Sequence, residues 1–418
     1  MTKFLFASLI AVTACQNPKY CAKQNPDNNC DEPGDGGNGS DGSGSNVTDC
    51  TTDSTVCTIA KPVCDTDSKT CVECEVAMDC KSATAPVCDA TDHTCGGCVA
   101  HSDCASGTCM PDGSCADDAQ VAWVDAGFGG SPDANCSKAT PCKTISPALD
   151  ATSKSIVHIK AGSYTTEAIT INDKTKTIVG DRDNTGALTS VWGAPAGGIP
   201  LSIGGTTTKL SVKDVAFVGS TVDIVSMLTT GADELHLLGS SIVGTSAVGL
   251  DVTGGAVTIE RTQVANCLGG GISMSKSSLK MTNAIVSGNS GGTSTGGVFL
   301  SLTNATIDFS TIADNTAGGT ATKGVNNSTA NTCTITNSDL SNNTGAQATG
   351  CTVATSNTYP DAFTGNMNVV PMLTATYHLD PSSPLVDMAS TTATVPVDID
   401  GNKRPMGANR DIGADEAN

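Results

Sequence analysis

Six eight-residue segments with a shared pattern recur through the second half of this 418-residue chain. They are LSVKDVAF from Leu210, LHLLGSSI from Leu235, VTIERTQV from Val257, LKMTNAIV from Leu279, ATIDFSTI from Ala305 and CTITNSDL from Cys333. Their starts lie 25, 22, 22, 26 and 28 residues apart, and positions 1, 3 and 8 are apolar or small in each. The alternation predicts strands rather than helices. A repeat this short cannot bury its inner face alone, so neighbouring repeats must stack at a spacing of about 4.8 Å.

A second pattern precedes four of these segments. Apolar residues stand two apart after a glycine in GLDV from Gly249, GISM from Gly271, GVFL from Gly297 and GCTV from Gly350. VHIKAGSY from Val157 fits the first pattern. Each repeat is therefore predicted to hold two or three short strands, a tight connection and a corner. A β-sandwich or a propeller is the alternative, but a propeller blade needs about 40 residues.

This arrangement resembles a right-handed parallel β-helix of the pectate-lyase-like superfamily, over roughly residues 121–415. The opening, with Trp123-Val-Asp125 and PCKTI from Pro141, is similar to the first motif of that family. The resemblance implies a short helix over residues 144–152 that caps the open end of the coil. The end, PVDIDGNKRPMGANRDIGADE from Pro396, resembles the C-terminal segment of bacterial surface proteins of the choice-of-anchor Q type. The expected fold class is mainly β, a right-handed parallel β-helix solenoid preceded by a small disulfide-rich module and a disordered tether.

Twelve cysteines form three units of four between residues 50 and 115. The units are Cys50, Cys57, Cys64 and Cys71; Cys74, Cys80, Cys88 and Cys95; and Cys98, Cys104, Cys109 and Cys115. Apolar residues are too few here for a core, so disulfides, each contributing roughly 2–4 kcal/mol, must replace one. Two disulfides per unit leave three connectivities open in each. Cys136 and Cys142 flank a short loop and are also predicted to pair.

Zinc is the alternative for these cysteines. Cys71 and Cys74, like Cys95 and Cys98, have the C-x-x-C spacing of metal ligands. Export would place these thiols in an oxidising compartment, and each C-x-x-C pair straddles a junction between units. Disulfides are therefore predicted, and no metal site is.

The first 15 residues, MTKFLFASLIAVTAC, have the pattern of a signal peptide for the general secretory route. The apolar stretch of 9 residues is far shorter than the roughly 20 that span a bilayer. The residues VTAC resemble a bacterial lipobox, which implies cleavage before Cys15 and acylation of that cysteine. An ordinary secretory signal is the alternative. Gln16 stands where the family's inner-membrane retention signal has Asp, which favours the outer membrane and the cell surface.

Four regions are expected in the chain. They are a lipoprotein signal peptide over residues 1–14, a lipidated flexible tether over 15–49, the cysteine-rich repeats over 50–115 and the β-helix over 116–418. The Gly/Asp/Ser run of the tether buries nothing. The net charge of −20 argues against a nucleic-acid partner. The expected partners are the membrane, through the lipid anchor, and a polysaccharide or surface protein.

No catalytic constellation is predicted. Inverting glycoside hydrolysis needs two carboxyl groups roughly 6.5–9.5 Å apart. Glu260 and Asp308 share a position in the repeat, but Thr282 separates them, and Arg261 beside Glu260 fits a surface ion pair. We therefore expect a non-enzymatic surface lipoprotein for glycan, matrix or cell-surface contacts. The alternative is a polysaccharide lyase or glycoside hydrolase whose site includes loops such as 181–200.

No cofactor is expected, and calcium is only a weak alternative. Asp181-Arg-Asp183 and Asp398-Ile-Asp400 could hold it, although Asp in such loops more often completes a turn. The histidines at 158, 236 and 378 are scattered, without an obvious partner.

Three asparagines occupy one position in the repeat, and they predict a stacked corner. Asn289, Asn315 and Asn343 each stand three residues after an octet, and left-handed backbone, which Asn tolerates, is the expected reason. Cys267 takes that position in its own repeat. Cys333 and Cys351 fall on different walls in this alignment, so they are not expected to pair.

Overall fold

The computed structural model describes residues 49–417 except 53, 220, 293, 319–323 and 330. Two compact units divide the chain, one of residues up to Lys81 with Val87–Gly96, the other of Ser82–Pro86 with the chain from Gly97 onward. The lipidation site predicted at Cys15 and nearly all of the predicted tether lie outside the described residues. Within the described ranges, no helix is both long and apolar enough to cross a bilayer.

The first unit contains two short antiparallel hairpins. Strand β1 (Val63–Asp65) pairs with β2 (Thr70–Val72), and β3 (Val87–Asp89) pairs with β4 (Thr94–Gly96). Two 3₁₀ turns, η1 (Ser54–Val56) and η2 (Ala77–Asp79), accompany them. Two more, η3 (His101–Asp103) and η4 (Asp118–Gln120), belong to the second unit.

Disulfides join the first cysteine of each unit to the third and the second to the fourth. The pairs are Cys50–Cys64, Cys57–Cys71, Cys74–Cys88, Cys80–Cys95, Cys98–Cys109 and Cys104–Cys115. In both hairpins the third and fourth cysteines face each other across the strands, yet each bonds to a cysteine outside the hairpin. Each hairpin is thereby linked covalently to the part of the chain that precedes it. Cys136 and Cys142 also pair.

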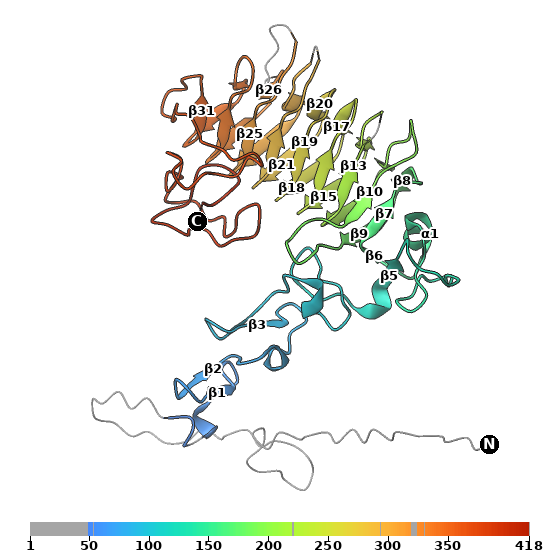
Figure 1. Cartoon of the computed structure of the whole chain (residues 1–418), viewed down its shortest axis with the longest axis vertical. Helices are drawn as coiled ribbons and strands as arrows, with labels where there is room; N and C mark the ends of the chain where they lie inside the picture. Colours follow the sequence, from blue (N-terminus) through green and yellow to red (C-terminus); the bar gives the residue numbers. More distant parts are fainter. Residues whose placement is uncertain are drawn as a thin grey trace, which may run out of the picture. The chain divides into compact units, whose positions relative to one another are not determined.

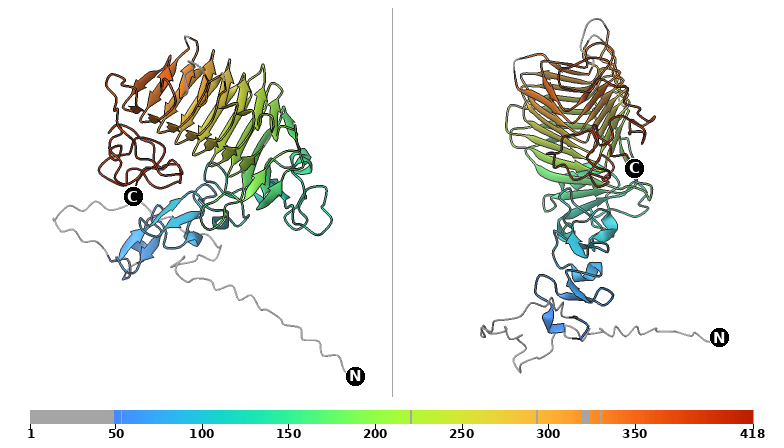
Figure 2. Two further views of the ribbon diagram at one scale, coloured as in Figure 1. Left: turned by 45° about the horizontal axis from the view of Figure 1, so that its top comes forward. Right: turned by 90° about the vertical axis from the view of Figure 1, so that its left-hand side faces the viewer.

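The second unit is a right-handed parallel β-helix with three walls, which we name A, B and C. Wall A has eight strands, β8 (Ile169–Asn172), β11 (Leu201–Gly204), β14 (Val225–Leu228), β17 (Val248–Thr253), β20 (Gly270–Ser275), β23 (Val298–Ser301), β26 (Val325–Asn327) and β29 (Ala348–Thr349). Wall B has ten, β5 (Val121–Val124), β6 (Ile156–Ile159), β9 (Thr175–Gly180), β12 (Lys209–Lys213), β15 (Glu234–Leu238), β18 (Ala256–Glu260), β21 (Ser278–Thr282), β24 (Asn304–Asp308), β27 (Cys333–Thr336) and β30 (Thr352–Ala354). Wall C has nine, β7 (Gly162–Tyr164), β10 (Ser190–Trp192), β13 (Ala216–Val218), β16 (Ser241–Val243), β19 (Gln263–Ala265), β22 (Ile285–Ser287), β25 (Thr311–Ala313), β28 (Asp339–Ser341) and β31 (Asn357–Tyr359). Figures 1 and 2 show the strands of successive coils side by side in the order of the sequence.

Each eight-residue segment of the sequence spans two walls. In VTIERTQV, Val257 and Ile259 point into the core from β18, and Val264 does so from β19. Between the strands, Arg261 adopts φ 47°, a left-handed conformation that turns the chain sharply. The six segments align without gaps because this corner always has the same length. The predicted strand, tight connection and corner are confirmed.

The glycine-led pattern corresponds to wall A in three of its four occurrences. GLDV, GISM and GVFL lie on β17, β20 and β23. The fourth, from Gly350, does not. Its residues continue into β30 of wall B, because the last coil is shorter than the earlier ones and wall A is reduced there to the two residues of β29.

This misplacement explains why the prediction for Cys333 and Cys351 is wrong. The two cysteines are joined by a disulfide, with their Cα atoms 4.6 Å apart. Thr334 of β27 pairs with Thr352 of β30, so the two preceding cysteines are neighbours on adjacent strands of one wall. Cys267 remains free and buried.

The open end of the coil is capped as the resemblance implied. Helix α1 (Ile145–Asp150) follows Thr144 and buries Ile145, Ala148 and Leu149 against the first coils. The large aromatic side chains of the early coils are also internal. Trp192 and Phe217 are fully buried, with ring centroids 5.3 Å apart.

The three repeat asparagines form a hydrogen-bonded ladder inside the β-helix. Asn289 Nδ2 donates to Asn315 Oδ1 at 2.9 Å, and Asn315 Nδ2 donates to Asn343 Oδ1 at 2.9 Å. The backbone N–H of Cys267 donates to Asn289 Oδ1, so Cys267 ends the ladder. The stacking is confirmed, but the expected reason is wrong. The left-handed residues stand one position earlier, at Asn266, Gly288, Asp314 and Asn342, and the ladder residues are selected for their amides.

After β31 the chain folds back along the corner between walls B and C as a segment without strands, residues 360–417, which we call the C-terminal segment (Figure 1). Asn283 Nδ2 donates to the carbonyl of Val397 at 2.6 Å, and the N–H of Gly413 donates to Asn337 O at 2.9 Å. Phe309, at the corner after β24, is buried in a small apolar cluster with Ile412 and other side chains of the segment.

Replacing Asp339 by asparagine is expected to stabilise the protein above pH 6 and to have little effect at pH 4. Burial raises the pKa of Asp339 to about 6, although Ser341 Oγ and Asn357 Nδ2 donate to its carboxylate at 2.7 and 2.8 Å. A raised pKa means that the stability contribution is complete below the unfolded value of 3.8 and is lost as the pH rises through about 6. Asparagine avoids the charge; its amide oxygen can accept from Asn357 while its NH₂ donates to the Ser341 hydroxyl, so the gain at neutral pH should approach about 3 kcal/mol. Urea unfolding of both proteins from pH 4 to pH 8 measures it, and a gain that did not depend on pH would contradict the account.

Candidate functional site

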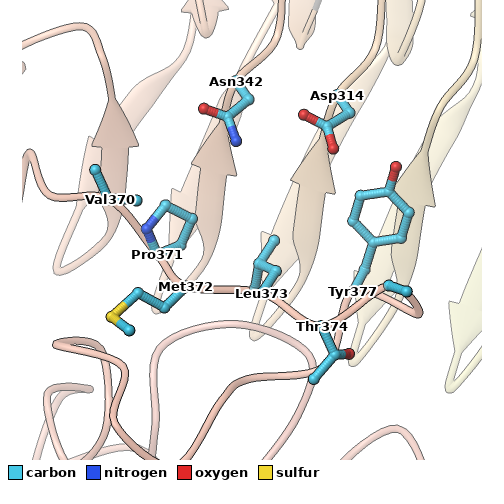
Figure 3. Close-up of a pocket in the computed structure, with 9 residues that line it drawn as sticks. Asp314, Asn342, Val370, Pro371, Met372, Leu373, Thr374 and Tyr377 are labelled. Atoms are coloured by element: carbon cyan, nitrogen blue, oxygen red, sulfur yellow. The ribbon is translucent and has the colours of Figure 1, made fainter.

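A hollow of about 320 Å³ lies where residues 370–377 of the C-terminal segment pass the edge of wall C; we call it the strap hollow (Figure 3). Asp314 and Asn342 reach it from the corners after β25 and β28, and Tyr377 reaches it from the segment. Both Asp314 and Asn342 are exposed, while Tyr377 is half-buried. Burial and the nearby Asp314 carboxylate raise the pKa of Tyr377.

Four residues that line the strap hollow have left-handed backbone, as other corner residues of the β-helix also do. Asp314, Asn342, Met372 and Tyr377 all have φ between 53° and 65°. A left-handed residue costs roughly 1–2 kcal/mol, and Asn and Asp tolerate it better than a bulky side chain. Tyr377 adopts this unfavourable backbone conformation where its ring lines the hollow, and strained residues are found most often at functional positions.

A second concave region follows the corner between walls B and C, and we call it the corner groove. It comprises two hollows of about 430 and 360 Å³ that share Arg261. The first is lined by residues such as Arg182, His378 and Asp400, and the second by Glu260, Lys280 and Asp308. The C-terminal segment forms its other side through Val395–Val397 and Ile399.

The two arginines of the corner groove differ in their contacts. Arg182 Nε donates to Asp214 Oδ1 at 2.7 Å, and its Nη atoms donate to the carbonyls of Gly186 and Gly239. That guanidinium is fixed by the fold. Among the described residues, the Arg261 guanidinium has no hydrogen bond or ion pair, so the expected ion pair with Glu260 is absent. Arg261 is therefore a cation of the groove that remains available to a ligand.

Glu260 and Asp308 lie on the same wall, two strands apart, although 48 residues separate them in the sequence. Both pair in register with Thr282, one strand on either side, so their Cα atoms are about 9.6 Å apart by the strand spacing. Their side chains lean apart, however. Glu260 lies 3.9 Å from His236 of the preceding coil, and Asp308 accepts hydrogen bonds from Thr336 and Asn337 of the following coil.

His378, Asp400 and Asp415 come together beside the first hollow of the corner groove. Their ligating atoms all lie within 4.8 Å of one another, and His378 Nε2 is 3.1 Å from Asp400 Oδ2. The contact with Asp400 raises the pKa of His378, and the same contact lowers the pKa of Asp400 against the effect of burial. Burial raises the pKa of Asp415. The sequence did not indicate this cluster, because its members come from three separate loops.

A different cluster contains His101, His158 and Asp181, and it joins the third cysteine unit to the β-helix. His158 Nε2 donates to Asp181 Oδ1 and its Nδ1 contacts Thr108 Oγ1, both at 2.8 Å. His101 accepts from the N–H of Cys109 and donates to the carbonyl of Gly180, both at 2.9 Å. Burial lowers the pKa of His158 and keeps its ring neutral. All four ring nitrogens are already engaged, which fits a structural contact rather than a metal site.

The loops considered for calcium form turns in the structure. Asp183 Oδ1 accepts from the N–H groups of Thr185 and Ala187, while Asp181 faces His158 instead. Asp398 Oδ1 accepts from the N–H groups of Asp400 and Asn402. The two carboxylates of each loop thus point to different partners.

Comparison with known proteins gives a likeness of low similarity. One solved structure that matches is the crystal structure of pectate lyase Pel9A, with 12% identity and a TM-score of 0.42. The match covers 71% of this chain and 96% of that chain. No family model and no curated protein matches.

Proposed function

We propose that this protein is a lipid-anchored protein of the outer bacterial surface whose β-helix binds glycans without cleaving them. The lipobox-like VTAC, the Gly/Ser/Asp-rich tether and the disulfide-bonded units support its display away from a membrane. The observation that carries the binding function is the strap hollow. It combines an aromatic ring with an exposed carboxylate and an exposed amide.

These three groups have complementary roles toward a sugar. The Tyr377 ring offers an apolar face for the C–H side of a pyranose, while Asp314 accepts from hydroxyls and Asn342 both donates and accepts. A volume of about 320 Å³ lies at the lower end of the range for small-molecule sites, about 300–1,000 Å³. The hollow is open to solvent along residues 370–377, so one sugar unit of a longer polysaccharide could occupy it.

Replacing Tyr377 by alanine is expected to weaken glycan binding about 5- to 10-fold, because the stacking surface is lost. The chain without the signal peptide and Cys15, residues 16–418, would be run by affinity electrophoresis through neutral and acidic polysaccharides. Tyr377→Phe should retain most of the binding. Asn342→Gly removes the amide while glycine keeps the left-handed backbone, and it should weaken binding too.

Asn266→Gly is the matched control for these variants. Asn266 has φ 57° and is exposed at the equivalent corner after β19, outside the strap hollow. The proposal predicts unchanged retention for this variant. If no polysaccharide retarded the protein, or if Tyr377→Ala ran like the unmodified chain on every one that did, the strap hollow would not be the binding site.

A second candidate, a polysaccharide lyase or glycoside hydrolase, is favoured by one observation. Glu260, Asp308 and the unpaired Arg261 line one hollow, with the two carboxylates on strands two apart. An enzyme would need these carboxylates to turn toward each other when a substrate binds. New reducing ends or unsaturated products that disappear in Asp308→Asn would establish it and would overturn binding without cleavage.

A further inference from the structure

Three loops of the C-terminal segment place one imidazole and two carboxylates around a common point. His378 ends the turn that follows Thr374, Asp400 lies in the DIDG turn, and Asp415 lies in DIGADE near the end of the chain. Their ligating atoms all lie within 4.8 Å of one another. Donors on a tetrahedral zinc ion lie about 3.4 Å apart, given bonds of about 2.0–2.1 Å. The 3.1 Å between His378 Nε2 and Asp400 Oδ2 is close to that separation.

The histidine is oriented as metal-binding histidines are. His378 Nδ1 lies 3.1 Å from the carbonyl oxygen of Thr376 and 2.9 Å from Thr376 Oγ1. When an Nδ1–H is donated to that carbonyl, loss of the proton from Nε2 leaves a lone pair directed toward Asp400, where a metal ion would replace the proton. Histidine ligands usually donate their other ring N–H to a carbonyl or a carboxylate in this way.

Asp415 provides an independent observation, because it is a buried carboxylate with too few donors. The residue is only 6% exposed. One oxygen accepts from the N–H of Leu379 at 2.8 Å, and within the described part of the chain that is the only hydrogen bond to this carboxylate. Its charged neighbours in the cluster are Asp400 and His378. A buried carboxylate beside a second one is stabilised by a compensating cation, which a bound metal ion would supply.

We propose that His378, Asp400 and Asp415 bind a divalent transition-metal ion, of which Zn²⁺ is the representative. Imidazole with carboxylate oxygen is a ligand set that suits zinc better than magnesium or calcium. The ion joins three loops that have no strands of their own and thereby holds the C-terminal segment together. His378 and Asp400 also line the corner groove, so coordination positions not filled by protein face that groove.

The test is a calorimetric titration of Zn²⁺ into untagged residues 16–418, the chain without the signal peptide and Cys15, after treatment with EDTA and removal of the EDTA. One ion per chain should bind, and Co²⁺ in its place should give a visible absorption spectrum typical of nitrogen and oxygen ligands. Asp400→Asn should weaken binding at least about tenfold, as loss of a ligand does, and Asp400 is exposed enough for this variant to fold. His378→Gln should do the same.

His236→Gln is the matched control, since His236 also lies near a carboxylate, 3.9 Å from Glu260, but outside the cluster. It should bind like the unmodified chain. The proposal fails if the unmodified chain gives no saturable heat, if both Asp400→Asn and His378→Gln bind as the unmodified chain does, or if His236→Gln abolishes binding. Metal binding is measured without any glycan, so this test can succeed or fail independently of the test of the proposed function.

Discussion

Replacing Glu416 by alanine is expected to lower the free energy of unfolding of the C-terminal segment by about 3–5 kcal/mol and to release it from the β-helix. Glu416 Oε2 lies 3.0 Å from Arg404 Nη1, and the two side chains are 1% and 0% exposed. Glu416 also accepts from the N–H groups of Met406 and Asp411. Alanine would remove the carboxylate that contacts the Arg404 guanidinium, which is buried over the ring of Phe309.

Trypsin gives the most direct measurement, because Arg410 is half-buried and precedes the buried Asp411, so the bond between them becomes accessible when the segment opens. The variant should be cleaved there far faster than the unmodified chain. Glu234→Ala is the matched control, since Glu234 forms an ion pair of 2.8 Å with Lys209 in which both side chains are 55% exposed. A surface pair contributes at most about 1 kcal/mol, so this variant should resist trypsin. Equal resistance of Glu416→Ala would show that the ion pair does not hold the segment.

Replacing Asn315 by alanine is expected to destabilise the β-helix by about 4 kcal/mol, because four buried hydrogen bonds of roughly 1 kcal/mol each are lost. Asn315 Nδ2 donates to the Val286 carbonyl and to Asn343 Oδ1, and its Oδ1 accepts from the backbone and side chain of Asn289. Water cannot replace these contacts, since Asn315 is fully buried. Guanidinium unfolding followed by circular dichroism measures the loss.

The neighbouring corner offers the control for this prediction. Asn342 is exposed and has φ 53°, so Asn342→Gly removes an amide without straining the backbone. Its effect on the free energy of unfolding should be within about 0.5 kcal/mol. Similar losses for Asn315→Ala and Asn342→Gly would mean that the ladder contributes nothing beyond an ordinary surface asparagine.

The walls of the β-helix could be predicted because each coil repeats the same pattern of inward-pointing apolar residues and a left-handed corner. Val257, Ile259 and Val264 point inward and Arg261 makes the corner, and the same positions do so in the other coils. The last coil departs from this rule. Gly350 there has φ 68° and precedes a wall B strand, whereas the earlier glycines of the pattern lie in wall A strands or just before one. Sequence alignment alone could not distinguish the two, and the Cys333–Cys351 disulfide was missed for that reason.

The hollows could not be predicted because one side of each comes from a segment outside the repeat. Asp314 and Asn342 face Tyr377 only after the C-terminal segment has folded back. One signal was present. Asn266, Gly288, Asp314 and Asn342, the residues that precede the ladder positions, are all of types that tolerate left-handed backbone. The pieces DIDG and DIGADE likewise contained Asp400 and Asp415, but nothing in the sequence placed them beside His378.

The central claim is that the β-helix binds a glycan through the strap hollow and does not cleave it. Binding and cleavage should be measured on one sample, in which residues 16–418 are incubated with the polysaccharide that retards them most. The account predicts retention that is lost in Tyr377→Ala, with no new reducing ends and no unsaturated products after prolonged incubation. Product formation by the unmodified chain, abolished in Asp308→Asn and preserved in Tyr377→Ala, would contradict it.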